Sequence, residues 1–322
     1  IDRGGVFASV YGSIALQSEQ DRKLIKGIVI NKFRGDLRLF DDGRRIMEDI
    51  CGVPVLGVIP YYKDIHIEEE DSVALSAKNT NFELQTSKLN VAVVMLRHIS
   101  NFTDFDALEQ DPRIHLFYTN NTDDIEKADI IIVPGSKSTL SDLYELRRNG
   151  CAQAVVRAHR NGATVLGICG GYQLMGVEVC DPDHVEGYIE RLPGLGLLPV
   201  STIMSGEKRT QQVECEFGSG YEIHMGETCP FGDAAAKPLL HLSDGHSDGY
   251  LLDRKCMGTY VHGILDNASF VDYLLEPYTN LLAERSQPFN YQTYKEEQYN
   301  RLADHVRRHL DMEQLYKILT ND

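Results

Sequence analysis

Short apolar runs, rich in β-branched residues, alternate with longer amphipathic stretches along much of the chain. Runs of this kind predict buried strands, and apolar positions at helical spacing predict the helices between them. We expect strands at residues 27–31, 53–60, 91–96, 114–118, 130–133 and 164–168, and helices at 6–16, 39–51, 140–146 and 152–159. The alternation predicts an α/β fold in which helices cover parallel sheets. Within the helix at 39–51, Leu39, Ile46 and Ile50 are the expected apolar positions.

A polar, weakly patterned stretch at residues 68–88 interrupts the alternation and predicts a surface helix followed by a linker. We therefore expect a first domain at 1–83, a linker at 84–88, a second domain at 89–275 and a helical tail at 276–322. In the tail, apolar and amphipathic residues recur at helical spacing at Leu302, His305, Val306 and Leu310. A length of 322 residues agrees with about two domains.

The composition narrows the classes of function. A net charge of −16, spread along the chain, argues against a nucleic-acid surface. No run is apolar enough to cross a membrane, and no signal peptide precedes the first strand. Seven cysteines without a Cys-x-x-Cys pair favour reduced thiols in the cytoplasm over disulfides or structural zinc. The chain opens at Ile1 without a methionine, which suggests a fragment or a processed piece; a homo-oligomer is compatible with the sequence.

Residues 164–176, TVLGICGGYQLMG, carry the strongest chemical signal. An apolar strand that breaks through a glycine-rich turn into a helix is typical of a nucleophile elbow, here with Cys169 in the nucleophile position. Glycines allow the strained turn, and the helix N-terminus favours a thiolate, which is expected to lower the pKa of the thiol. The N–H groups of the same turn suit an oxyanion. A buried structural cysteine in a βα turn is the simpler alternative.

A second glycine and serine turn, PGSKST at residues 134–139, follows the apolar run at 130–133 directly. A turn that opens a helix at the end of a strand presents free N–H groups to an anion. We expect the strand at 164–168 to be the fourth parallel strand of the second domain and its elbow to lie beside this turn. That arrangement would bring a nucleophile and an oxyanion donor together.

A thiolate needs a base, and eleven histidines are available. His224 lies in YEIHMG, whose alternation predicts a strand, and His262 lies at the end of another expected strand in GTYVHG. Either could face a cleft, and spacing alone does not choose between them, because the partners of a catalytic cysteine are close in space rather than in sequence.

The first domain offers only weak candidates for binding a nucleotide. Asp2 and Asn31-Lys32 come at the ends of expected strands, where an aspartate suits Mg²⁺ and an Asn-Lys pair suits a base. On spacing alone, solvated loop residues are the better interpretation. The sequence has no Gly-x-x-x-x-Gly-Lys-Ser/Thr loop, so no phosphate cradle is predicted.

Taken together, GICGGYQLMG, PGSKST and GTYVHG resemble the class I glutamine amidotransferase domain, which has a flavodoxin-like α/β fold. The resemblance implies that Cys169 is the nucleophile and His262 the base. It also implies an oxyanion hole at Gly170 with Gly135 or Ser136, and a glutamine-binding role for Gln173. Many members carry a glutamate two residues after the histidine. Ile264 occupies that position here, so the resemblance implies a Cys/His pair without the usual orienting carboxylate.

DRGGVFAS, GIVINKFRGD, ISNFTDFDAL, GYEIHMG and the tail narrow the resemblance to the cobyric acid synthase family over the whole chain. It implies a partial P-loop or dethiobiotin-synthetase-like domain before the amidotransferase domain. Asp2 then corresponds to a Mg²⁺-side acidic residue, and Asn31 and Lys32 to the nucleotide-base loop.

That family uses glutamine, ATP and Mg²⁺ to amidate adenosylcobyrinic acid a,c-diamide, and the amidotransferase domain itself is expected to bind no metal or cofactor. Without the P-loop, the chain is expected to keep at most the glutaminase half-reaction. A related amidotransferase, such as cobyrinic acid a,c-diamide synthase or a lipid-amidating subunit, and a non-catalytic binding module are the alternatives.

Overall fold

The predicted strands are present in the computed structural model, which describes residues 5–67, 84–282 and 289–320. Their order along the chain is as expected, and their ends differ from the predicted ends by a few residues. The bounds are β1 Ile28–Phe33, β2 Val55–Pro60, β3 Leu89–Val94, β4 Ile114–Thr119, β5 Ile130–Val133 and β6 Thr164–Ile168.

The chain divides into two compact units, and one of them is discontinuous in sequence. Unit 1 comprises Ile1–Ile67 and Thr293–Asp322, and unit 2 comprises Glu68–Gln292. The expected tail at 276–322 is therefore divided between the units, because its helical part packs on strand β2 of unit 1. The surface helix expected within residues 68–83 lies outside the described residues.

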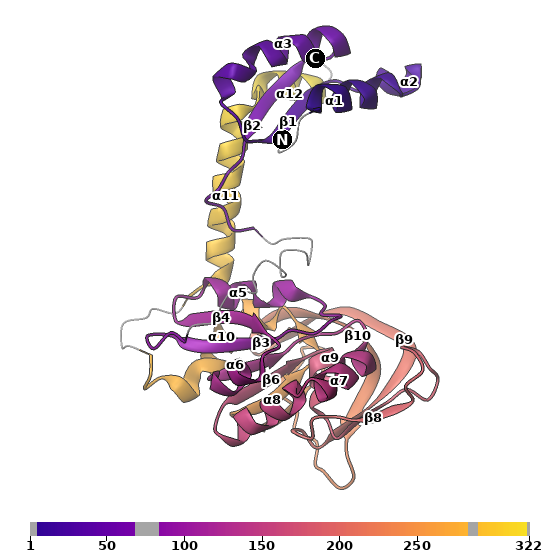
Figure 1. Cartoon of the computed structure of the whole chain (residues 1–322), viewed down its shortest axis with the longest axis vertical. Coiled ribbons are helices and arrows are strands. Elements are labelled where there is room, and N and C mark those ends of the chain that lie inside the picture. Colours follow the sequence, from indigo (N-terminus) through magenta and orange to yellow (C-terminus); the bar gives the residue numbers. More distant parts are fainter. Residues whose placement is uncertain (1–4, 68–83, 283–288, 321–322) are drawn as a thin grey trace. The chain divides into compact units, whose positions relative to one another are not determined.

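Unit 1 is built on a short parallel pair of strands, β1 and β2. Its helical segments are α1 Val6–Ala15, α2 Glu19–Arg22, η1 Leu37–Phe40, α3 Asp41–Cys51, α11 Tyr291–His309 and α12 Met312–Thr320 (Figure 1). The tail is held on β2 by backbone hydrogen bonding, since the N–H of Asp311 donates to the carbonyl of Leu56 at 2.7 Å. The ring of His305 also lies 2.9 Å from the carbonyl oxygen of Pro60.

The apolar positions expected for α3 are not the residues that the helix buries. Leu39, Ile46 and Ile50 are 83%, 52% and 46% exposed, whereas Met47 is completely buried with Ile14 and Val55. The helix starts two residues later than expected. Its buried face is the one that packs against α1 and β2. Propensity and spacing identified the helix, and packing decided which of its faces is covered.

Unit 2 contains a six-stranded sheet in the order β13-β14-β6-β5-β3-β4, with β13 Tyr250–Asp253 and β14 Cys256–Thr259. Five strands are parallel, and only β13 at the edge is antiparallel. Its helices are η2 Phe102–Phe105, α5 Asp106–Gln110, α6 Thr122–Lys127, α7 Thr139–Arg148, α8 Cys151–Arg160, α9 Gly170–Met175, η3 Ile264–Asp266, α10 Ala268–Leu275 and η4 Glu276–Tyr278. As predicted, β6 lies beside β5, so the elbow and the PGSKST turn share one edge of the sheet.

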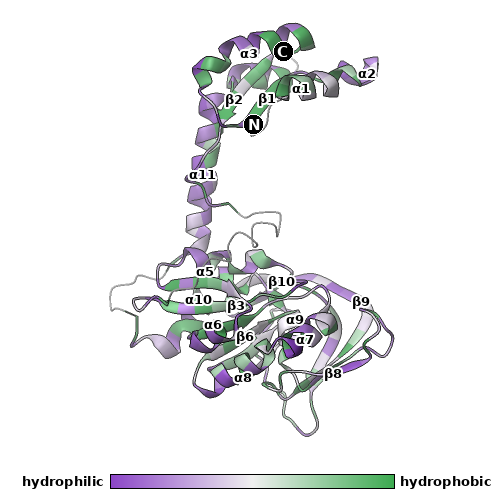
Figure 2. Ribbon diagram, in the orientation of Figure 1, coloured by the Kyte–Doolittle hydropathy of each residue, from purple (hydrophilic) through white to green (hydrophobic). Residues whose placement is uncertain are grey.

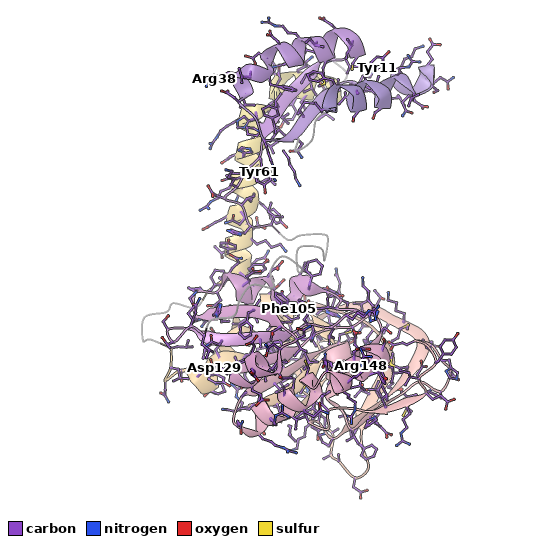
Figure 3. All side chains as sticks on the ribbon, viewed as in Figure 1. Tyr11, Arg38, Tyr61, Phe105, Asp129 and Arg148 are labelled. Atoms are coloured by element: carbon purple, nitrogen blue, oxygen red, sulfur yellow. The ribbon has the colours of Figure 1, made fainter. Side chains whose placement is uncertain are left out.

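Helices and loops cover both faces of this sheet, which explains why its strands are continuously apolar. Ile131 and Val165 point into one core, whereas Ile130 and Leu166 on the same strands point into the other. The strands β3 and β6 are accordingly among the most hydrophobic parts of the ribbon in Figure 2. Phe105, labelled in Figure 3, is fully buried in the second core.

A second, five-stranded sheet, in the order β15-β10-β9-β7-β8, was not predicted. Its bounds are β7 Glu178–Cys180, β8 Arg191–Pro193, β9 Val200–Cys215, β10 Gly218–Pro230 and β15 Val261–His262, and a small pair is formed by β11 Leu240–His241 and β12 Ser247–Asp248. Tyr221 of β10 pairs with His262 of β15, so this sheet reaches one of the candidate bases. Within the described residues, no helix is both long and apolar enough to span a bilayer.

We predict that Gly57→Ala weakens unit 1. A Cβ at this position would lie 2.1 Å from the carbonyl oxygen of His309, so the tail would have to move away from β2. We expect a loss of about 1–3 kcal/mol in the free energy of unfolding and faster amide exchange in α12. The control is Gly12→Ala in α1, where no atom lies within 4 Å of the added carbon. Equal stability and exchange in both variants would contradict this packing.

Candidate active site

The elbow has the geometry that its glycines predicted. β6 ends at Ile168, Cys169 adopts φ 52° and ψ −113°, and α9 begins at the next residue. A positive φ is costly for a residue with a side chain and is tolerated where packing enforces it. Here the helix start packs closely against strand β5, because a Cβ on Gly171 would lie 1.8 Å from the carbonyl oxygen of Val133. The turn therefore holds the Cys169 side chain at the end of the strand, 6% exposed.

The PGSKST turn meets the elbow at its second glycine. A Cβ on Gly170 would lie 2.8 Å from the backbone nitrogen of Ser136, so only a glycine allows this approach. Cys169, Gly170, Ser136 and Gln173 all line one cavity of about 320 Å³. Gly135 is not among the lining residues, and a Cβ there would meet Ser100 Oγ at 2.7 Å. Residues from two neighbouring strand ends thus meet in one cavity wall beside the thiol, where backbone N–H groups would suit a developing oxyanion.

His262 forms a buried pair with a carboxylate that the sequence analysis did not assign to the site. Its Nδ1 lies 2.6 Å from Asp104 Oδ2, and the side chains of His262 and Asp104 are 0% and 3% exposed. The other oxygen of Asp104 accepts the backbone N–H of Gly263 at 3.0 Å. The orienting carboxylate absent from position 264 is therefore supplied by the segment ISNFTDFDAL.

The pair changes the protonation of the histidine. Burial lowers the pKa of His262, but the hydrogen bond to Asp104 and the charges of Asp104 and Cys169 outweigh burial and raise the pKa to about 10. The ring is therefore cationic at neutral pH. Its Nε2 has no hydrogen-bond partner among the described residues, which leaves this atom available to exchange a proton at the thiol.

His224, the other candidate base, is held in a different state. Burial, first, and the charges of Arg209 and His262 lower its pKa to about 4, so the ring is neutral at physiological pH. Its Nδ1 lies 3.2 Å from the carbonyl oxygen of Gly226, and because a carbonyl only accepts, Nδ1 carries the proton. The ring stacks on Tyr260 with centroids 3.7 Å apart and lines the cavity. The structure therefore places His224 in the wall and pairs His262 with the carboxylate.

The side chain of Gln173 is engaged by the protein. Its Nε2 donates to the carbonyl of Met225 at 2.8 Å and to the hydroxyl of Tyr260 at 3.1 Å, and its Oε1 accepts from Thr139 at 3.2 Å. Gln173 therefore joins α9 to β10 and to the start of α7. It forms part of the cavity wall with its amide already hydrogen-bonded, and the glutamine-binding role that the resemblance implies stays a prediction.

The side chain of Asp142 stabilises the PGSKST turn by hydrogen bonding. This fully buried carboxylate accepts the Ser136 hydroxyl at 2.6 Å and the backbone N–H of His98 at 3.2 Å, and it lies 3.0 Å from His98 Nδ1. The backbone reinforces the arrangement, because the N–H of Ser100 donates to the carbonyl of Gly135 at 2.9 Å. The buried hydrogen bond from Ser136 to Asp142 thus fixes the position of Ser136 and of its backbone N–H.

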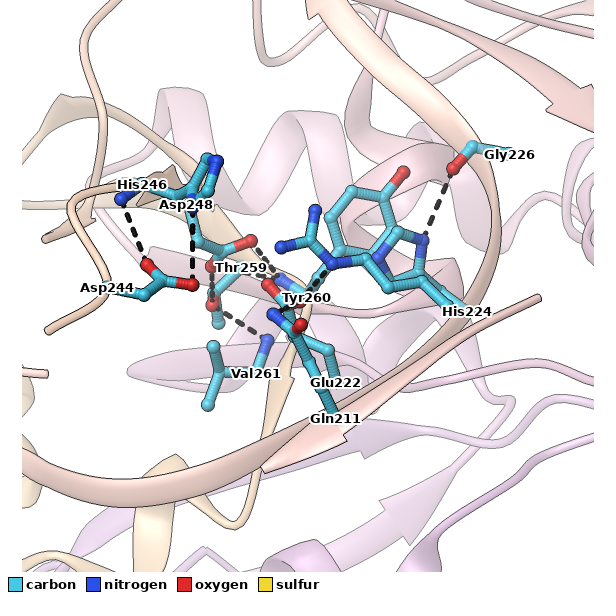
Figure 4. A network of polar contacts seen from close by, with 11 residues as sticks. Gln211, Glu222, His224, Gly226, Asp244, His246, Asp248, Thr259, Tyr260 and Val261 are labelled. Carbon is cyan, nitrogen blue, oxygen red and sulfur yellow. Dashed lines mark hydrogen bonds and ion pairs between the residues drawn. The ribbon is translucent and has the colours of Figure 1, made fainter. Parts of the chain in front are cut away.

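A polar network supports the strands that carry the two histidines (Figure 4). Asp248 accepts hydrogen bonds from the hydroxyl of Thr259 and the N–H of Tyr260. On β10, Glu222 is 3% exposed and pairs with Arg209 at 2.7 Å. Such buried groups stabilise one arrangement only when all members are paired. The network therefore favours a single register for the strands around the cavity.

The nucleotide candidates form no site within the described residues. Asp2 lies outside them. Asn31 and Lys32 lie inside β1 rather than in a loop after it, at an irregularity where pairing moves from Ile30–Val58 to Phe33–Pro60. Across residues 5–67, 84–282 and 289–320, no group of three or more histidine, cysteine or acidic side chains is placed to hold a metal.

An elbow cysteine, a buried histidine–carboxylate pair and an α/β sheet agree with the class I glutamine amidotransferase domain that the sequence resembles. The family profile described as the CobB/CobQ-like glutamine amidotransferase domain matches residues 90–270, more than half of the chain.

Curated relatives that match the whole chain are named cobyric acid synthase. Those from Bacteroides fragilis, Phocaeicola vulgatus and Parabacteroides distasonis are 67%, 62% and 53% identical to this chain. Each match covers 100% of this chain and 66% of the relative, so the chain spans just under two thirds of their length. The chain belongs to the CobB/CobQ-like glutamine amidotransferases, and among them to the cobyric acid synthase family.

Solved structures are more distant. "Crystal structure of glutamine amidotransferase" is 20% identical with a TM-score of 0.44, covering 58% of this chain and 97% of its own. "Structure of PurLQS from Thermotoga maritima" is 18% identical with a TM-score of 0.45, covering 59% and 99%. The family assignment rests on the sequence relatives and the profile.

We predict that Asp104→Asn lowers the turnover of glutamine by about 10²- to 10⁴-fold, because the ring of His262 loses its orientation and its charge partner. The variant also changes the pH dependence of stability. The pKa of His262 lies above its ordinary value of 6.5, so the pair stabilises the fold fully below that pH and is lost as pH rises through about 10. The free energy of unfolding should therefore fall more steeply from pH 7 to 10 in the wild type than in the variant.

The control is Asp106→Asn, which removes a nearby carboxylate that does not contribute to the pKa of His262. Urea unfolding at several pH values and glutaminase assays would be carried out on all three proteins. Parallel pH profiles of stability in the wild type and Asp104→Asn would contradict the assigned pair.

We predict that Asp142→Asn reduces turnover more than it raises the KM for glutamine, because a displaced Ser136 N–H weakens stabilisation of the transition state. Losing hydrogen bonds to a charged group should also cost about 1–3 kcal/mol of stability. Asp129→Asn is the control, since Asp129 accepts the N–H of Asn90 at 2.9 Å. It should lower stability alone. Equal losses of turnover in both variants would show that Asp142 acts only through stability.

Proposed function

We propose that this chain carries the glutamine-hydrolysing site of a cobyric acid synthase. One observation supports this most directly: Cys169, Gly170 and Ser136 line one cavity, and His262 is paired with the buried Asp104. The roles of nucleophile, acid–base and oxyanion donor then fall on residues that are already positioned by the fold.

In the proposed reaction, the thiolate of Cys169 attacks the side-chain amide carbon of glutamine. The carbonyl oxygen becomes an oxyanion that accepts hydrogen bonds from Gly170 and Ser136. Imidazolium His262 gives its Nε2 proton to the departing ammonia, and a thioester at Cys169 remains. Water then attacks the thioester with neutral His262 as base, which releases glutamate and restores the imidazolium–thiolate pair. Asp104 keeps the ring oriented throughout.

For the full-length enzyme, we propose the amidation implied by the sequence resemblance and by the names of the relatives. Its acceptor would be adenosylcobyrinic acid a,c-diamide, amidated at the b, d, e and g carboxylates. ATP with Mg²⁺ would supply the activation that a carboxylate needs before ammonia can attack it. This chain lacks a phosphate-binding loop in its sequence, so we expect it to retain at most the glutaminase half-reaction.

Labelling with a glutamine-like electrophile tests this function. Diazo-oxo-norleucine should add once to the chain and once to the full-length enzyme, and intact-mass measurement should place the adduct on Cys169. Cys169→Ala should show no adduct, whereas Cys151→Ala should still be labelled, because Cys151 is buried in the other core of unit 2. Absence of labelling in the full-length enzyme would overturn the proposal.

A further inference from the structure

The charges around the catalytic cavity complement a free amino acid. Among the residues that line it, Glu186 is the one carboxylate, and Lys137 and Lys208 bring ammonium groups. A substrate α-amino acid carries one ammonium and one carboxylate group, so it needs one partner of each sign. The pKa of His224 in the same wall is lowered to about 4, so its ring is neutral. It therefore adds no charge that would compete with Glu186 or the two lysines.

Glu186 is held in place by its surroundings. Its Oε2 accepts the N–H of Leu140 at 3.1 Å, in the first turn of α7. The N–H groups of Val185 and Glu186 each donate at 2.8 Å to Asp181, which is completely buried. Burial raises the pKa of Glu186, and hydrogen bonds from Leu140 and Thr139 at the start of α7 oppose that rise. A carboxylate has several acceptor positions, so these bonds leave capacity for an ammonium group. The side chain is fixed at the cavity before any ligand arrives.

The same hydrogen bonds connect Glu186 to the nucleophile. α7 begins at Thr139, whose hydroxyl donates to Gln173, and the N–H of Gln173 donates at 3.2 Å to the carbonyl of Cys169. The carboxylate and the thiol are therefore parts of one rigid frame. A ligand that places its amide carbon at the sulfur must extend its other end across this cavity.

We propose that Glu186 binds the α-ammonium group of glutamine and so makes the site selective for the free amino acid over amides that lack this group. Lys208 and Lys137 are the cations available to the α-carboxylate. The inference rests on the proposed glutaminase function and extends it to substrate recognition. The competing explanation is that Glu186 only caps α7.

The test compares two substrates in the full-length enzyme. Glutamine carries the α-ammonium group, and 4-carbamoylbutanoate has the same amide and carboxylate without it. In Glu186→Gln, kcat/KM for glutamine should fall by about 10- to 100-fold, mainly through KM, because a charge-assisted hydrogen bond is lost. The value for 4-carbamoylbutanoate should change less than about threefold, since this substrate never made that contact.

Two further variants complete the design. Glu186→Asp keeps the charge and should recover part of the preference for glutamine. Glu190→Gln removes a carboxylate from the same loop that is 74% exposed and outside the cavity wall, and it should leave both substrates unaffected.

An equal fall for both substrates in Glu186→Gln, or no fall for either, would overturn the assignment. Alkylation of Cys169 by iodoacetamide, which has no α-amino group, should be unchanged in Glu186→Gln. Failure of the proposed function itself would appear already in the wild type, as absence of glutamine hydrolysis.

Discussion

The buried contact between His262 and Asp104 is the interaction on which the site depends. Both side chains are almost fully excluded from water, so each charge is stabilised by the other rather than by solvent. Removing one partner from such a pair leaves an uncompensated buried charge, which is costly. Asp104 uses its second oxygen on the N–H of Gly263, so the same carboxylate orients the imidazole and the strand end that bears it.

The position of Asp104 also couples the base to the oxyanion turn. Residues 98–105 form one continuous segment, which bonds to the PGSKST turn through Ser100 and His98 and carries Asp104 at its other end. Asp142 closes this arrangement by accepting hydrogen bonds from both the segment and Ser136. A shift of the segment would therefore move the base and the oxyanion donor together. This explains how parts from distant strand ends keep a common geometry.

The five-stranded sheet turns a reactive cysteine at a sheet edge into an enclosed cavity. β10 passes close to the thiol, with the carbonyl oxygen of Ile223 3.6 Å from Cys169 Sγ, and it brings His224 and Met225 into the wall. Gln173 connects this strand to α9. Enclosure limits the access of water and strengthens the electrostatic contacts to a bound substrate. The sheet that supports the cavity thus also shapes it.

The sequence by itself determined the α/β class, the order of the six apolar strands, the elbow at Cys169 and the turn at Ser136. These features are local, because glycine placement and apolar spacing act over a few neighbouring residues. The tertiary structure alone decided which histidine pairs with a carboxylate and which residue supplies it. His262 and Asp104 are 158 residues apart, and no local pattern distinguishes a buried partner from a helix cap at that separation. The same holds for the exposed Leu39 and for the tail that packs on β2: burial depends on which surfaces meet, and only packing of the whole chain determines that.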